Sequence, residues 1–103
     1  GGGVGRMGDI CGALSGAVMS LGLKYGRVKA EDQDSGPKVY ALTEKLYGLF
    51  EKEFGSATCY DLIKTNLRNE EERKKWANEG GTKFCRDLVK KSARIVKQVV
   101  DEG

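Results

Sequence analysis

The chain has 103 residues, of which 39% are hydrophobic and 32% are charged, and its formal net charge is +3. This composition is typical of one globular domain, and it excludes a disordered chain. It also excludes a membrane-spanning chain, because no apolar run approaches the roughly 20 residues that cross a bilayer. Histidine is absent, which excludes Cys–His and Ser–His–Asp nucleophiles, mixed Cys/His zinc sites and histidine-ligated haem.

The front of the chain is rich in glycine. Its first eight residues, GGGVGRMG, predict a loop, and the apolar spacing that follows predicts a helix over 9–26 with Asp9 as its N-cap. Small residues recur at a spacing of four within this helix: Gly12, Gly16 and Ser20. We expect them to let another helix backbone approach closely, which offsets the low helix propensity of glycine.

The middle of the chain predicts a connection and two helices. Residues 27–36 are polar and turn-rich, so we expect them to form a surface connection. The next apolar residues are spaced for a helix that begins at Pro37 and is stopped by Gly55. Ser56 is suited to cap a short helix over 57–64.

The last part of the chain predicts two more helices. Acids precede bases in residues 65–81, as a helix dipole prefers, so we expect a short exposed helix pinned by Leu67 and Trp76. Thr82 is placed to cap a final helix with one apolar stripe and one basic stripe. The sequence therefore predicts an all-α fold, a small bundle of about four to five helices.

The three cysteines are the candidate site residues, and each falls in the first turn of a predicted helix: Cys11, Cys59 and Cys85. The amides and the positive dipole end of a helix favour a thiolate there, which predicts a lowered thiol pKa. The alternative is that they fill the core, because free cysteine is among the most buried residue types. An odd number of cysteines without a visible signal peptide argues against a secreted disulfide scaffold, so we expect the cytoplasm.

Two other features have structural explanations. Residues 64–97 contain eleven Lys/Arg against five Asp/Glu, but no interleaved aromatics or nucleic-acid motif accompany them, so we expect a solvated basic face. The glycine-rich loop lacks a preceding strand and a Gly-Lys-Ser/Thr sequence, which excludes a P-loop and a Rossmann fingerprint. An anion or cofactor group near Arg6 is the alternative to a tight packing loop.

The cysteine-bearing stretches resemble a known family. CGALSG at 11–16, the GLKYG after it, FGSATCYDL and KFCRDLV are similar to a family of small helical redox-active proteins with the signature Cys, Gly-Cys-Ala-x-x-Gly, Cys, Cys. Cysteine and glycine stand here in the opposite order to the first two positions of the Gly-Cys-Ala block. The family's first cysteine, on a helix upstream of the glycine-rich loop, has no counterpart. Either residues are missing from this chain or this member lacks that helix, and we expect a single helical domain over 1–103 without it.

The resemblance implies thiol redox or cluster chemistry without an established substrate, and three hypotheses stay open. In the first, Cys59 and Cys85 are an exchanging thiol pair, and Cys11 faces either the same site or the missing cysteine. In the second, the three thiols bind a metal ion or iron–sulfur cluster; their spacings of 48 and 26 residues contain no C-x-x-C pair. In the third, the chain is an interaction domain with buried cysteines. For partners we expect a homo-oligomer and a redox partner protein, with no nucleic acid and no membrane.

Overall fold

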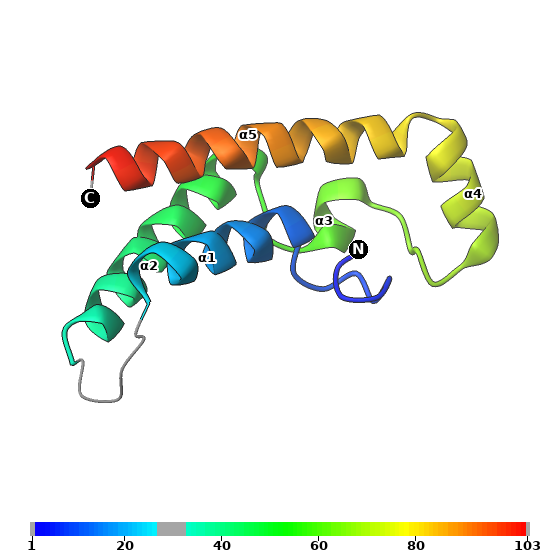
Figure 1. The fold of residues 1–103 in the computed structure, drawn as a ribbon. Helices are drawn as coiled ribbons and strands as arrows, with labels where there is room; N and C mark the ends of the chain where they lie inside the picture. Colours follow the sequence, from blue (N-terminus) through cyan, green and yellow to red (C-terminus); the bar gives the residue numbers. More distant parts are fainter. Residues whose placement is uncertain (1, 27–32, 103) are drawn as a thin grey trace.

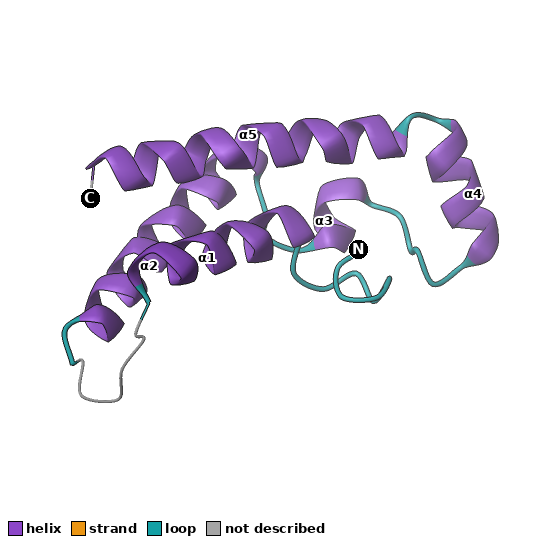
Figure 2. Cartoon of the chain, in the orientation of Figure 1, coloured by secondary structure: helices purple, strands orange, loops and turns teal. Residues whose placement is uncertain are grey.

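The computed structural model describes residues 2–26 and 33–102, and over these residues the fold is all-helical, as the sequence predicts (Figures 1 and 2). The helices are α1 Gly12–Tyr25, α2 Ser35–Phe54, α3 Cys59–Ile63, α4 Glu70–Asn78 and α5 Gly81–Glu102. Most of the predicted surface connection, residues 27–32, lies outside the described part. None of the described helices combines the length and apolarity that a membrane crossing requires.

Three long helices form the core. Helices α1, α2 and α5 pack against one another in pairs, and the largest fully buried side chains come from all three: Leu14, Leu21, Leu46, Phe50 and Val99. Helix α2 ends as predicted, because Gly55 adopts φ +89° and stops the helix in the left-handed conformation. The periodic apolar residues thus meet in one core.

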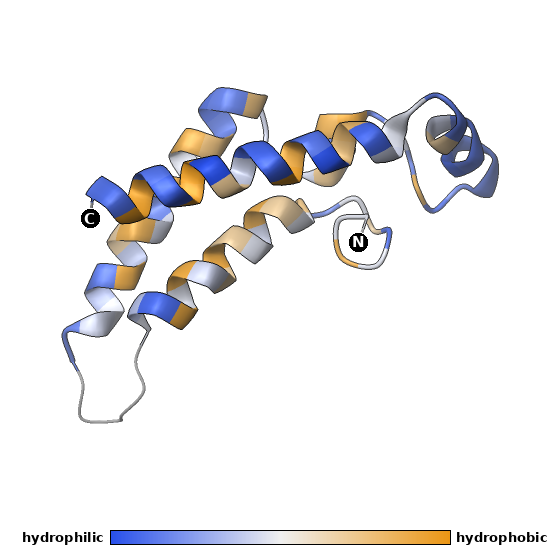
Figure 3. Ribbon diagram, turned by 45° about the horizontal axis from the view of Figure 1, so that its top comes forward, coloured by the Kyte–Doolittle hydropathy of each residue, from blue (hydrophilic) through white to orange (hydrophobic). Residues whose placement is uncertain are grey.

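Helix α4 lies at the end of α5 where that helix begins (Figure 1), and it is mostly hydrophilic (Figure 3). Asn69 caps it by accepting a hydrogen bond from the N–H of Glu72 at 3.1 Å. The two predicted anchors hold it: Leu67 is buried just before the helix, and the indole of Trp76 covers Gly81 so closely that no Cβ would fit there. The predicted short exposed helix is confirmed.

The predicted caps of α1 and α5 are wrong. Asp9 does not cap α1; its carboxylate accepts a hydrogen bond from the adjacent N–H of Ile10, and Cys11 occupies the N-cap position. Thr82 does not cap α5, because that helix already begins at Gly81. In both cases the chain turns into the helix under tertiary constraints, which a local cap motif does not reveal.

The glycine face of α1 is open, which corrects the expected close approach of another helix. A Cβ added at Gly12 or Gly16 would meet nothing within 4 Å. Met19 and Leu23 lie on this same side of α1 by helical spacing and are 68% and 91% exposed. Between α1 and the flank of α5 runs a groove of about 300 Å³. Gly12, Gly16 and Ser20 line the α1 side of this groove, and residues of α5 line its other side.

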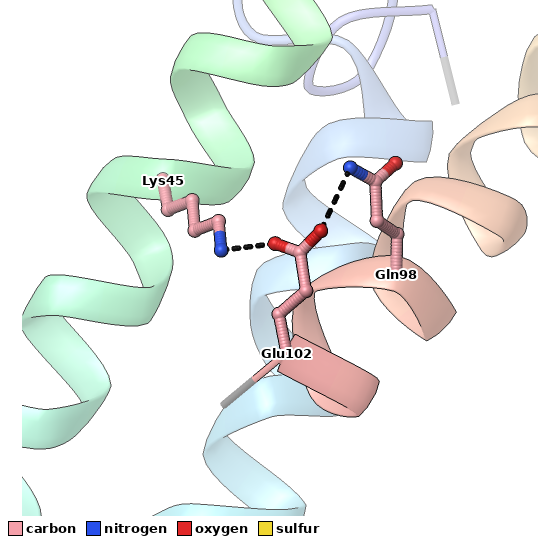
Figure 4. Close-up of polar contacts among 3 residues, drawn as sticks. All are labelled: Lys45, Gln98 and Glu102. Carbon is pink, nitrogen blue, oxygen red and sulfur yellow. Dashed lines mark hydrogen bonds and ion pairs between the residues drawn. The ribbon is translucent and has the colours of Figure 1, made fainter.

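A polar cluster ties the end of α5 to α2 (Figure 4). Lys45 donates to and pairs with the carboxylate of Glu102, which also accepts from the amide of Gln98 at 3.3 Å. The hydrogen bond from Lys45 is the main cause that lowers the pKa of Glu102, and the hydrogen bond from Gln98 is the next. Because Lys45 and Glu102 remain nearly half exposed, the cluster fixes the register of the two helices more than it stabilises the fold.

Candidate functional site

Residues 2–6 form a left-handed turn that packs against Cys59. All five have positive φ angles between 59° and 69°, and the N–H of Asp9 closes the turn by donating to the carbonyl of Gly3 at 2.9 Å. A Cβ on Gly3 would lie 2.5 Å from the Cβ of Cys59. The backbone therefore approaches this cysteine at a distance that only glycine permits.

A short antiparallel bridge holds Cys11 beside Cys59. The bridged pair is Ile10 and Thr58. Its hydrogen bonds run from the N–H of Cys11 to the carbonyl of Ala57 (2.8 Å) and from the N–H of Cys59 to the carbonyl of Asp9 (2.6 Å). Each cysteine lies one residue beyond the bridged pair, so both side chains leave the same face of the ladder. Such diagonal neighbours have Cα atoms about 7–8 Å apart, which is at the limit for a disulfide without backbone movement.

Hydroxyl groups fix the start of α3 and thereby the place of Cys59. The side chain of Thr58 caps the helix by accepting from the N–H of Asp61 at 3.4 Å. Ser56, the predicted cap, instead accepts from the N–H of Thr58 and donates to the carboxylate of Asp61. Cys59 is the first residue of α3, so its predicted first-turn position is confirmed.

Cys85 comes to the site from α5, with a different placement from the predicted one. Because α5 begins at Gly81, Cys85 is its fifth residue and lies in the second turn. Its N–H is therefore inside the helical hydrogen-bond pattern and is not one of the free amides at the helix end. Cys85 is half-buried, whereas Cys11 and Cys59 are buried, with 9% and 7% of their surface exposed.

All three cysteines line one pocket of about 870 Å³. They come from the start of α1, the start of α3 and the second turn of α5, which Figure 1 shows meeting near the N-terminal turn. The other lining residues are glycines of the turn, apolar side chains and two arginines: Gly2, Gly3, Gly5, Arg6, Gly12, Ala13, Ile63, Leu67, Arg73, Trp76, Leu88 and Val89. The fold thus brings together three thiols that are far apart in the sequence.

Burial raises the pKa of two of these thiols, which corrects the predicted lowering. For Cys59 the main cause is burial and the next is the nearby thiol of Cys11. For Cys85 burial is again the main cause, followed by the thiols of Cys59 and Cys11. Loss of hydration and repulsion between neighbouring thiolates both favour the neutral form. The reduced pocket therefore holds Cys59 and Cys85 as neutral thiols at neutral pH.

Two pocket residues carry features that the sequence-based interpretation did not assign to the site. Arg73 is half-buried, and its guanidinium donates to the carbonyl of Leu67 at 3.1 Å. Trp76 follows it at a spacing of three and was assigned only a packing role. Arg73 and Trp76 share one side of α4 because they are three residues apart. This spacing could not be connected with the cysteines without the tertiary structure.

The cysteines are free in this structure. Within residues 2–26 and 33–102, no group of three or more His, Cys, Asp or Glu side chains is arranged to hold a metal ion. The three thiols therefore share a pocket without forming a ready-made ligand set. A metal-binding arrangement would require these side chains to move, whereas exchange of one disulfide at a time requires only two sulfurs to meet.

Comparison with known proteins gives one match. No curated protein and no solved structure matches the chain. Residues 1–99 match the model of a protein family described as "Putative redox-active protein (C_GCAxxG_C_C)". This match covers all three cysteines and every residue of the pocket, and it agrees with the resemblance of the cysteine-bearing stretches. The chain belongs to this family.

Proposed function

We propose that the protein carries out thiol–disulfide exchange, with Cys85 and Cys59 as the exchanging pair. The observation that carries this proposal is the convergence of three cysteines, separated by 48 and 26 residues, on one open pocket. Cysteines that served only as small apolar residues would have no reason to share a solvent-accessible cavity. Membership of a family described as redox-active supports the same chemistry.

Solvent access assigns the roles of the two thiols. Cys85 is half-buried and can meet a disulfide that enters the pocket, whereas Cys59 is 7% exposed. The thiols of Cys59 and Cys11 both help to raise the pKa of Cys85, which supports a position of Cys85 close to both. Cys85 is therefore the attacking thiol and Cys59 the resolving thiol.

The reaction proceeds in two exchange steps. Cys85 loses its proton, and its Sγ attacks one sulfur of the substrate disulfide; that S–S bond breaks, and the other substrate sulfur leaves as a thiolate. Cys59 then loses its proton, and its Sγ attacks the Sγ of Cys85, which releases the second substrate thiolate. Both thiolates take up protons. In balance, two protein thiols are oxidised to a disulfide, and one substrate disulfide is reduced to two thiols.

The raised pKa values favour electron donation by the protein. An acidic thiol stabilises the reduced form of a dithiol pair and makes the pair oxidising. Burial acts in the opposite sense at Cys59 and Cys85, so the reduced pair gains no such stabilisation. We therefore expect this thiol pair to have a low reduction potential among dithiol pairs. This fits the cytoplasm as its place of action, with a redox partner protein that re-reduces the pair.

Trapping the mixed disulfide tests the proposal. After reaction with a small organic disulfide, the Cys59→Ser variant is expected to retain the substrate thiol on Cys85, because the proposed resolving thiol has been removed. The Cys85→Ser variant should form little adduct, and Cys11→Ser should still form the Cys59–Cys85 disulfide. Peptide mapping by mass spectrometry reads all three results. A wild-type protein whose thiols stay unmodified while folded would contradict the proposal and favour core-filling cysteines.

A further inference from the structure

The ionisable side chains around the pocket, apart from the thiols, are all cationic. Arg6 comes from the N-terminal turn and Arg73 from α4, and no carboxylate is among the lining residues of the described chain. The chain as a whole has 15 Asp and Glu, so their absence from this cavity is a property of the site. The pocket therefore offers positive charge beside the thiols.

Arg73 is fixed in place without a counter-charge. Its guanidinium donates to the carbonyl of Leu67 at 3.1 Å, and Leu67 is itself 6% exposed. Within the described residues, no Asp or Glu forms an ion pair with Arg73 or Arg6. A half-buried guanidinium without an anion has lost part of its hydration and has no paired charge to offset that cost. A bound anion would supply the missing partner.

The remainder of the lining suits an apolar body. Ile63, Leu67, Leu88, Val89 and Trp76 contribute carbon surface. A volume of about 870 Å³ lies within the range of pockets that bind small organic molecules. Trp76 adds an aromatic side chain to the same pocket as the two arginines. The pocket thus combines an apolar wall, an anion-binding group and the reacting thiols.

We infer, on the basis of the proposed thiol–disulfide function, that the substrate is a small organic disulfide that carries carboxylate groups. The carboxylate pairs with Arg73, Arg6 adds a second positive charge, and the organic body packs on Trp76. This orientation presents the substrate S–S bond to Cys85. The two-step exchange then releases two carboxylated thiols and leaves the Cys59–Cys85 disulfide, with atoms and electrons balanced as above.

Binding can be measured apart from the redox reaction. Trp76 is the only tryptophan of the chain, so its fluorescence reports occupancy of the pocket. The probes are a diaryl thioether dicarboxylate, which cannot exchange with thiols, and its uncharged dicarboxamide of the same shape. The fully reduced wild-type protein is titrated with each. We expect the dicarboxylate to bind roughly tenfold more tightly, as a charge-assisted hydrogen bond implies.

Variants identify the groups responsible. Arg73→Gln is expected to remove most of this tenfold preference, and Arg6→Gln a smaller part. Arg73→Lys keeps the charge and should keep part of the preference, which separates loss of charge from disturbance of the fold. The matched control is Arg68→Gln, because Arg68 is an exposed arginine outside the pocket, and this change should leave the preference intact.

The outcomes separate the inference from the proposed function. Equal binding of the two probes, or a preference that survives Arg73→Gln, would overturn the carboxylated-disulfide assignment. The mixed-disulfide experiment could still succeed in that case, since it does not depend on substrate charge. Conversely, a charge preference that depends on Arg73 in a protein with unreactive thiols would support the anion site and refute the redox step.

Discussion

Replacing Gly3 with alanine tests how the N-terminal turn covers Cys59. The added Cβ would lie 2.5 Å from the Cβ of Cys59 and 2.6 Å from the backbone N and O of Asp9. None of these atoms is the far end of a flexible side chain, so the turn must shift. Gly5→Ala is the matched control, because Gly5 has nearly the same φ (60° against 64°) but nothing within 4 Å of its Cβ position.

The difference in the free energy of unfolding between Gly3→Ala and Gly5→Ala isolates the contact of the turn with Cys59 and Asp9. An alanine in the left-handed region costs about 1–2 kcal/mol at either position, offset in part by the reduced entropy of the unfolded chain. Overpacking against Cys59 and Asp9 adds about 1–3 kcal/mol at Gly3 alone. We therefore expect Gly3→Ala to lower the free energy of unfolding by about 1–3 kcal/mol more than Gly5→Ala does.

Urea denaturation measures this difference in the free energy of unfolding. The rate at which Cys59 is alkylated in the folded protein measures how well the turn still covers this side chain. In Gly3→Ala the turn can detach while the rest of the domain stays folded, and the loss of stability is then limited to the free energy of detachment. In that case Cys59 should be alkylated several times faster in Gly3→Ala than in Gly5→Ala. Equal stabilities together with equal alkylation rates would refute the close contact between the turn and Cys59.

Three further predictions follow from the same structure. Burial raises the pKa of Cys59 and Cys85 above the ordinary value of 9.0. The contribution of these two thiols to stability is therefore fully present below about pH 9 and is lost at higher pH. As the pH rises from about 8 to 10.5, the urea midpoint should fall less in a Cys59→Ala/Cys85→Ala variant than in the wild-type protein. Thr58→Ala removes the cap of α3 and should destabilise by about 1 kcal/mol, with unchanged urea midpoints contradicting that role. The open face of α1 predicts a homo-oligomer, so Leu23→Asp should weaken self-association in sedimentation equilibrium; a wild-type monomer at high concentration would exclude it.

The sequence alone determined the helices and the points where they stop. The apolar spacing of α2 and α5 and the stop at Gly55 are local properties, since they depend on a helical period and on the conformational freedom of one glycine. Local patterns placed the caps less well: Asp9, Ser56 and Thr82 all have suitable side chains, yet the helices begin at neighbouring residues. The family, too, was visible in the cysteine-bearing stretches.

The tertiary structure decided what surrounds each cysteine. The bridge between Ile10 and Thr58 joins segments 48 residues apart and places Cys11 beside Cys59, a pairing that no local pattern encodes. The pKa shifts have the opposite sign to the predicted one, because burial and neighbouring thiols raise the pKa of Cys59 and Cys85, and Cys85 does not lie at the helix end. Arg73 joins the site only because α4 is placed beside the start of α5 in the folded chain. Spacing along the chain predicts faces of helices, whereas convergence of distant residues depends on how those faces pack.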